Sequence, residues 1–157
     1  MNRNAKEAFH WIIKILRKHK VPFRISGGLA ANVYGSKRDL ADIDIDVPDK
    51  EIVRLIPLFK RYKIIGLKHY KGKEWDVNFI SINYKGQDVD LIGSDYQRIF
   101  NKNTGKWEDF KINLKNIQKE SIFGLFVPVI TKKELIEYKS KVRRLVDLLD
   151  IKNLMQY

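Results

Sequence analysis

The chain has 157 residues and a formal charge of +12, with 31 Lys and Arg against 19 Asp and Glu. This length suits one domain over residues 1–157, and the 44% apolar content is sufficient for a core. The absence of cysteine excludes a disulfide framework, a thiolate nucleophile and any Cys-based metal site. The first twenty residues lack the features of a secretory signal, and no stretch approaches the ~20 apolar residues of a membrane span. We therefore expect a soluble, cytoplasmic protein that makes no membrane contact and favours anionic partners.

Hydrophobic periodicity in the first part of the chain predicts helices that alternate with short strands. Asn4 and Glu7 have the spacing of a capping box ahead of the first apolar helical pattern. The predicted elements are a helix over 5–18, a strand over 21–26, a helix over 29–34, a strand over 42–47 and a helix over 50–61.

The rest of the chain predicts a cluster of strands followed by helices. The expected elements are strands over 62–67, 75–84 and 87–92, a polar surface excursion over 93–119, a strand over 122–130, and helices over 132–140 and 143–155. Thr131 and Glu134 form a capping box at the start of the first of these two helices. This order predicts a mixed α/β (α+β) sandwich, in which helices pack on a mixed sheet.

Residues 42–47, Asp-Ile-Asp-Ile-Asp-Val, alternate with the period of a strand. The three apolar side chains face the core, so Asp42, Asp44 and Asp46 line the opposite face within a few ångströms of one another. Like charges in a row repel and raise each other's pKa unless a cation compensates them. Carboxylate oxygens suit Mg²⁺, so this strand predicts a divalent metal site.

Asp88 and Asp90 repeat the alternation on another predicted strand. If that strand lies beside the first, one of its carboxylates can complete a three-carboxylate site. Such a site can hold two metals for phosphoryl or nucleotidyl transfer.

Gly27 and Gly28 lie between a predicted strand and a predicted helix. A glycine pair is usually a tight turn, but missing side chains also let a phosphate approach backbone N–H groups, and Ser26 adds a hydroxyl. The pattern does not match a P-loop, because no Gly-Lys-Ser/Thr follows. The histidines have no ligand spacing, and Trp11, Trp75 and Trp107 are interpreted as core or edge aromatic residues.

Two separated motifs resemble the DNA polymerase β-like nucleotidyltransferase superfamily. The first is Ile-Ser-Gly-Gly at 25–28, followed by Arg38 and the Asp-Ile-Asp-Ile-Asp run. The second is Leu-Ile-x-x-Lys ending at Lys139, followed by Asp-Leu-x-Asp-Ile over 147–151. The resemblance is greatest to small lincosamide and aminoglycoside nucleotidyltransferases. It is weaker to CCA-adding enzymes, which have Arg-Asp where this chain has Ala-Asn at 31–32.

The resemblance implies a role for each of these residues. Asp42 and Asp44 would bind metal, and Asp90 would be the third, catalytic carboxylate, with Asp88 as the alternative. The nucleotide-binding residues would be Ser26, Gly27, Gly28, Arg38 and Lys139. Asp46 would support the strand, and Asp147 and Asp150 would anchor the last helix through Arg143 or Arg144.

The implied activity is transfer of a nucleoside monophosphate from an NTP to an acceptor hydroxyl, with release of pyrophosphate. Mg²⁺ or Mn²⁺ would be the cofactor, and the acceptor would be a small molecule such as an antibiotic, or a tRNA. Two alternative functions stay open: a non-catalytic nucleotide- or RNA-binding module, and a toxin–antitoxin enzyme acting on tRNA or protein. Whether the protein forms a homodimer also stays open.

Overall fold

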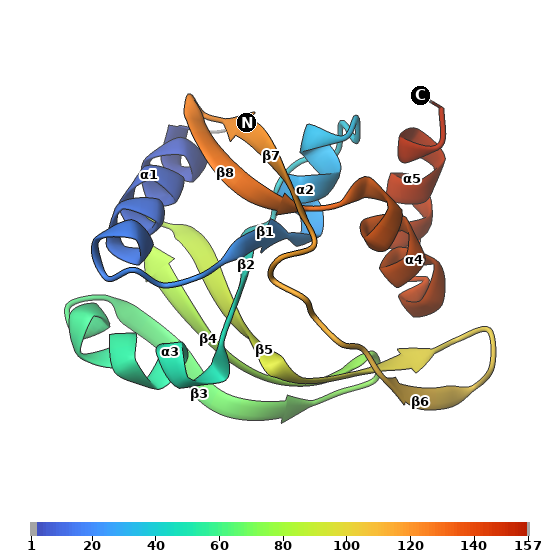
Figure 1. Cartoon of the computed structure of the whole chain (residues 1–157), viewed down its shortest axis with the longest axis horizontal. Helices are drawn as coiled ribbons and strands as arrows, with labels where there is room; N and C mark the ends of the chain where they lie inside the picture. Colours follow the sequence, from blue (N-terminus) through green and yellow to red (C-terminus); the bar gives the residue numbers. More distant parts are fainter. Residues whose placement is uncertain (1–2, 157) are drawn as a thin grey trace.

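The computed structural model describes residues 3–156, over which helices surround one mixed sheet of eight strands (Figure 1). The elements are α1 (Arg3–Lys18), β1 (Arg24–Ser26), α2 (Gly27–Val33), β2 (Asp42–Val47), α3 (Asp49–Leu55), the 3-10 helix η1 (Ile56–Phe59), β3 (Lys63–Lys71), β4 (Trp75–Tyr84), β5 (Gln87–Asn101), β6 (Lys106–Asp109), β7 (Ile117–Ile122), β8 (Leu125–Ile130), α4 (Lys132–Val142) and α5 (Leu145–Leu154). The mixed α/β architecture expected from the sequence is confirmed.

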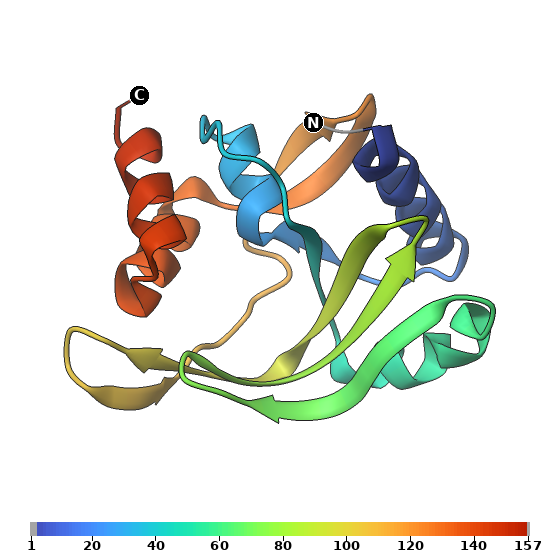
Figure 2. The ribbon, with the colours of Figure 1, turned by 180° about the vertical axis from the view of Figure 1, so that it is seen from behind.

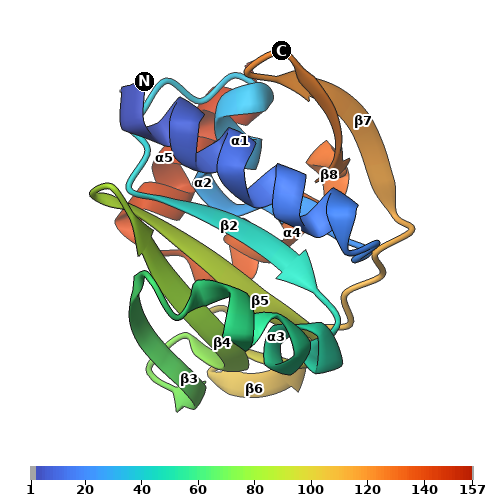
Figure 3. The same ribbon diagram turned by 90° about the vertical axis from the view of Figure 1, so that its left-hand side faces the viewer.

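The strand order of the sheet is β3-β4-β5-β2-β1-β8-β7, and β6 pairs with the end of β5. The pairs β2–β5 and β1–β8 are parallel, and the other neighbours are antiparallel. Strands β3, β4 and β5 run together as one wing of the sheet, which is clear from behind (Figure 2). Viewed from the side, α1 and α3 lie on the near side of the sheet, whereas α4 and α5 lie behind it (Figure 3).

The core lies between α1 and the apolar face of the central strands. The apolar residues that α1 repeats at helical spacing are all buried, and so are the three apolar side chains of β2: Ala8, Phe9, Ile12, Ile13, Leu16, Ile43, Ile45 and Val47. The period-2 pattern of β2 therefore places its aspartates on the face away from α1. No helix within residues 3–156 is long and apolar enough to cross a membrane.

The segment over 93–119, expected as a surface excursion, contains regular strands that the sequence did not predict. Strand β5 continues to Asn101 and forms a hairpin with β6, and Gly105 in the connecting turn has a φ of +70°. Strand β7 then begins at Ile117. Phe100 and Trp107 pair across the hairpin, so a few aromatic residues stabilise strands within an otherwise polar sequence.

The expected strand over 122–130 is confirmed from Leu125 onward as β8, whereas Ile122 ends β7. Phe123 and Gly124 both have positive φ, as a tight hairpin turn requires, and they separate β7 from β8. The predicted helix over 50–61 is likewise divided into α3 and η1, where Pro57 lacks the N–H that a continuous helix needs.

Other boundaries move by a few residues. Strand β1 is shorter than 21–26, and β3 extends beyond 62–67. Asn4 lies inside α1, so the capping box expected there is wrong, whereas the Thr131 hydroxyl accepts a hydrogen bond from the Glu134 N–H as expected. The last two helices meet at Arg143, which adopts the left-handed conformation.

Candidate active site

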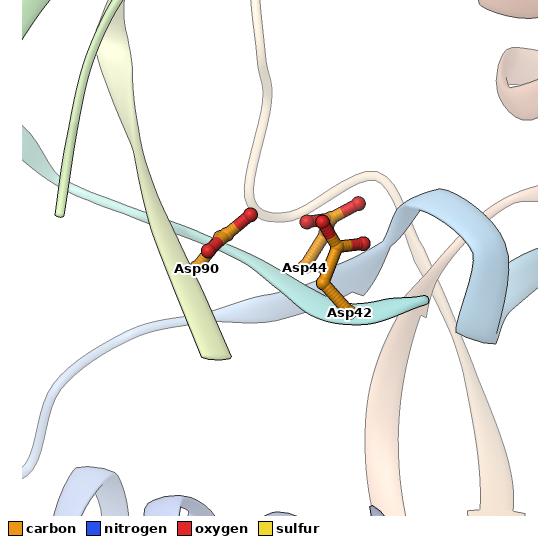
Figure 4. A group of neighbouring side chains, drawn as sticks. All are labelled: Asp42, Asp44 and Asp90. Carbon is orange, nitrogen blue, oxygen red and sulfur yellow. The ribbon is translucent and has the colours of Figure 1, made fainter. Parts of the chain in front are cut away.

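Three aspartates converge on one face of the sheet. The parallel register of β2 and β5 pairs Asp44 with Asp90. Asp42, Asp44 and Asp90 each direct a carboxylate oxygen to a common point, and these oxygens lie within 4.8 Å of one another (Figure 4). Asp88 pairs with Asp42 in the register but is not part of this group, and its Oδ1 accepts a hydrogen bond of 2.9 Å from the Asn83 amide. The structure thus brings together Asp90, and not Asp88, with the two aspartates of β2.

The electrostatics of this aspartate triad favour a bound cation. Burial, together with the charges of Asp42, Asp90 and Asp46, raises the pKa of Asp44 well above its ordinary value. Burial also raises the pKa of Asp90 to about 7, although a hydrogen bond from Ser81 opposes the shift. One oxygen of Asp90, Oδ1, is buried without a hydrogen-bond partner. Hard oxygen donors with an unpaired buried atom are a donor set that fits a divalent metal such as Mg²⁺.

Asp46 has a different environment, although it shares the face of the triad. Its carboxylate is buried and accepts hydrogen bonds from Arg24 Nε at 2.7 Å and from Ser26 Oγ at 3.2 Å. Arg24 also pairs with Glu134, which joins β1 and β2 to the first turn of α4. Asp46 is therefore charge-balanced by the protein and supports the strand, in agreement with its predicted role.

Gly27 and Gly28 form the first turn of α2, which begins two residues earlier than expected. Gly27 has a φ of +60°, and a Cβ on it would lie 2.1 Å from Asp44 Oδ2. A Cβ on Gly28 would lie 2.9 Å from Arg38 Nη2. The glycines thus allow the backbone to approach a carboxylate on one side and a guanidinium on the other.

Arg38 is held over Gly28 by a carboxylate from α5. Its Nε donates to Asp150 Oδ1 at 2.8 Å, and the Ser36 hydroxyl donates to the same oxygen at 2.6 Å. Arg38 and both glycines line the cavity in front of the triad. Burial opposes ionisation of Asp150, but its hydrogen bonds from Arg38, Ser36 and Lys139 hold its pKa below the ordinary value.

Lys139 lies in a buried ion-pair cluster at the edge of the same cavity. Its side chain is 1% exposed, and Nζ lies 3.0 Å from both Asp147 Oδ1 and Asp150 Oδ2. Its charge is therefore balanced by two carboxylates of α5. This burial excludes the alternative that Lys139 is an ordinary surface lysine exposed to solvent.

Arg144 completes the cluster. It donates to both oxygens of Asp147, from Nε at 2.8 Å and from Nη2 at 3.0 Å. The expected anchoring of α5 is thus confirmed for Asp147, which pairs with Arg144, but it is wrong for Asp150, which pairs with Arg38 and Lys139. The alternative partner, Arg143, forms the turn between the helices and makes no ion pair among the described residues. The Arg144 guanidinium also lies 4.6 Å from the ring centre of Trp75.

These groups surround a cavity of about 410 Å³. Besides the predicted site residues, it is lined by apolar and aromatic side chains that the sequence did not indicate: Tyr70, Trp75, Val77, Phe79, Ile92, Phe110, Ile112 and Tyr138. Trp75, Val77 and Phe79 alternate along β4, so their spacing alone places them on one face of the strand. Nothing in the sequence indicated that this face turns towards the triad.

Comparison with solved structures shows that the chain has the nucleotidyltransferase fold. A Thermotoga maritima protein, TM1012, that is assigned to the nucleotidyltransferases matches with a TM-score of 0.69 at 20% identity, over 99% of this chain and 96% of that chain. The lincomycin-bound lincosamide antibiotic adenylyltransferase LnuA matches with a TM-score of 0.64 at 19% identity, over 98% of each chain. ANT(2'')-Ia in complex with adenylyl-2''-tobramycin matches with a TM-score of 0.65 at 13% identity, over 96% of this chain and 87% of that chain. No protein-family model matches the sequence, and no curated protein matches it.

Proposed function

We propose that this protein transfers a nucleoside monophosphate from an NTP to a hydroxyl of a small-molecule acceptor. The observation that carries the proposal is the convergence of Asp42, Asp44 and Asp90 within 4.8 Å, with an unpaired buried oxygen on Asp90. A protein gains no stability from three adjacent unpaired carboxylates, so their assembly is best explained by a ligand that carries positive charge.

The triad divides the reaction between its members. Divalent Mg²⁺ or Mn²⁺ bound there would neutralise phosphate charge and lower the pKa of the acceptor hydroxyl. Asp42 and Asp44 would hold the ions. Asp90 orients the attacking hydroxyl and accepts its proton. The acceptor oxygen then bonds to the α-phosphorus, the bond from that phosphorus to the β-phosphate oxygen breaks, and pyrophosphate leaves with those electrons.

The opposite side of the triad binds the triphosphate. Gly27 and Gly28 lack side chains that would occupy this space, and Ser26 adds a hydroxyl that is shared with Asp46. Arg38 is oriented by Asp150 through Nε, so its remaining N–H groups are directed over Gly28 for phosphate oxygens. Lys139 holds Asp150, the carboxylate that orients Arg38.

The proposal of a small-molecule acceptor rests on similarity to solved structures. LnuA is described with lincomycin and ANT(2'')-Ia with an adenylylated tobramycin, so two structural neighbours bind small molecules. The charge of +12 favours a second candidate, in which a tRNA is the acceptor. A cytoplasmic location and a homodimer remain predictions from the sequence.

A transfer assay tests the proposal. Each α-labelled NTP is incubated with Mg²⁺ or Mn²⁺ and with lincosamides, aminoglycosides or total tRNA. Label is expected in one acceptor, and it is lost in the Asp42→Ala/Asp44→Ala variant but retained in Asp88→Asn, which changes a carboxylate on the same face outside the triad. NTP binding without metal dependence, together with no transfer, would instead indicate a non-catalytic module.

A further inference from the structure

The cavity extends beyond the triad along an apolar wall on the β4–β5 wing. Trp75, Val77 and Phe79 form this wall on β4, and Ile92 continues it on β5. Phe79 pairs with Ile92 in the sheet register, and Ile92 lies two residues beyond Asp90 on the same face. We name these four residues the apolar wall.

The position of the wall relative to the triad identifies the reactant it would contact. In the sheet order, β2 with Asp44 lies between β1, which leads into Gly27, and β5, which carries Asp90. The attacking and leaving oxygens lie in line on opposite sides of the reacting phosphorus. If the triphosphate occupies the glycine side, the acceptor approaches from the Asp90 side, where the apolar wall begins.

Neighbouring side chains hold Trp75 of the wall in place. The Trp75 indole N–H donates to the Tyr138 hydroxyl of α4, and the Tyr138 ring packs edge-on against Phe110 at 5.2 Å. Arg144 covers the Trp75 ring at 4.6 Å and is itself held by Asp147. These contacts restrain the rings before any ligand binds, which reduces the entropy lost on binding.

The charges of the cavity argue against a polycationic acceptor. Among its lining residues in the described chain, the carboxylate outside the triad is Asp46, and Arg24 already pairs with it. The other charged lining residues are basic: Arg38, Lys139 and Arg144. These three cations are paired with Asp147 and Asp150, so an acceptor with several ammonium groups would find no unpaired carboxylate outside the triad.

We propose that the apolar wall is the acceptor subsite, and that it takes an uncharged alcohol whose ring packs against Trp75 and Phe79 while its hydroxyl reaches Asp90. This inference rests on the nucleotidyl transfer proposed above. It differs from a site for a polycation such as the tobramycin moiety bound to ANT(2'')-Ia, because the wall recognises a ring by stacking.

Ligand-observed NMR tests the subsite without knowledge of the natural acceptor. Benzyl alcohol is the neutral ring probe and tobramycin the polycationic probe. Both are added to the protein with Mg²⁺ and a saturating, non-hydrolysable α,β-methylene ATP. Benzyl alcohol is expected to bind with the nucleotide present. Trp75→Ala should weaken this binding about fivefold or more, because it removes the stacking surface. Tobramycin should not displace the probe.

A matched variant and a nucleotide titration complete the experiment. Trp107→Ala removes an indole that does not line the cavity, and it should leave benzyl alcohol binding unchanged. If Trp75→Ala does not fold, Phe79→Ala removes a neighbouring ring of the wall. Metal-dependent nucleotide binding by the wild-type protein is measured separately. Its absence would refute the proposed function, whereas the benzyl alcohol result tests the subsite.

Three results would overturn the subsite. Displacement of benzyl alcohol by the nucleotide would assign the wall to the nucleobase. Equal binding in Trp75→Ala, or no binding by wild type, would show that the wall does not recognise rings. Displacement by tobramycin would show that the cavity accepts polycations.

Discussion

Asp90→Asn should stabilise the metal-free protein while it abolishes transfer. In the folded chain burial raises the pKa of Asp90 from 3.8 to about 7. Between these two pH values the carboxyl keeps its proton in the folded chain and has released it in the unfolded chain. The unfolded state therefore binds fewer protons, and the stability of wild type falls as the pH rises from about 4 to about 7. An asparagine keeps an oxygen to accept the Ser81 hydrogen bond and does not ionise.

The size of the effect follows from the shift. A shift of about three pKa units corresponds to at most about 4 kcal/mol of unfolding free energy. Because Asp90 shares its proton with Asp42 and Asp44, we expect the single substitution to gain about 2 kcal/mol. For a chain of this length, that gain raises the Tm by about 4–8 °C. The difference should be fully present above about pH 7 and small near pH 4.

The assay is denaturant and thermal unfolding in EDTA across this pH range. Asp88→Asn is the control, because it removes a carboxylate from the same strand outside the triad, and it should not show the pH-dependent gain. Added Mg²⁺ should stabilise wild type more than Asp90→Asn. An Asp90→Asn variant that is no more stable than wild type at about pH 8 would refute the electrostatic account of the triad.

Three further predictions concern the surroundings of the triad. Gly27→Ala should reduce transfer by about 100-fold or more, because the new Cβ would lie 2.1 Å from Asp44 Oδ2 and would displace it; near-normal kcat would contradict this. Lys139→Met should lower the free energy of unfolding by about 3 kcal/mol, because two buried carboxylates lose one of their cations and keep Arg144 and Arg38; a change below about 1 kcal/mol in urea unfolding would oppose this. The affinity for Mg²⁺, measured by calorimetry, should fall as the pH decreases below about 7, because protons compete for Asp90; a pH-independent affinity would count against the triad as the metal site.

The core of the candidate site could be predicted because it depends on local periodicity. Alternation along two strands determines which side chains share a face, so Asp42 and Asp44, and the pair Asp88 and Asp90, could be identified before their register was known; only the resemblance favoured Asp90. The glycine pair was visible for a similar reason. The choice between Asp88 and Asp90 needed the pairing of β2 with β5, which no local pattern specifies.

The aromatic part of the cavity could not be predicted, because it depends on long-range packing. Phe110 follows a hairpin in a polar segment for which the sequence predicted no particular structure. Trp75 resembles an ordinary edge aromatic residue until α4 and Arg144 pack over it. Lys139 was assigned a ligand-binding charge, but its burial between two carboxylates arises only when α5 folds back on α4.

The central claim is that the aspartate triad holds metal ions against a nucleotide. A crystal structure with Mn²⁺ and α,β-methylene ATP tests it most directly, since anomalous scattering identifies the manganese. The account predicts two manganese peaks bridged by Asp42 and Asp44, one of them also bound by Asp90, with the triphosphate against Gly27 and Gly28. Nucleotide bound elsewhere, or a triad without manganese in the presence of bound nucleotide, would contradict it.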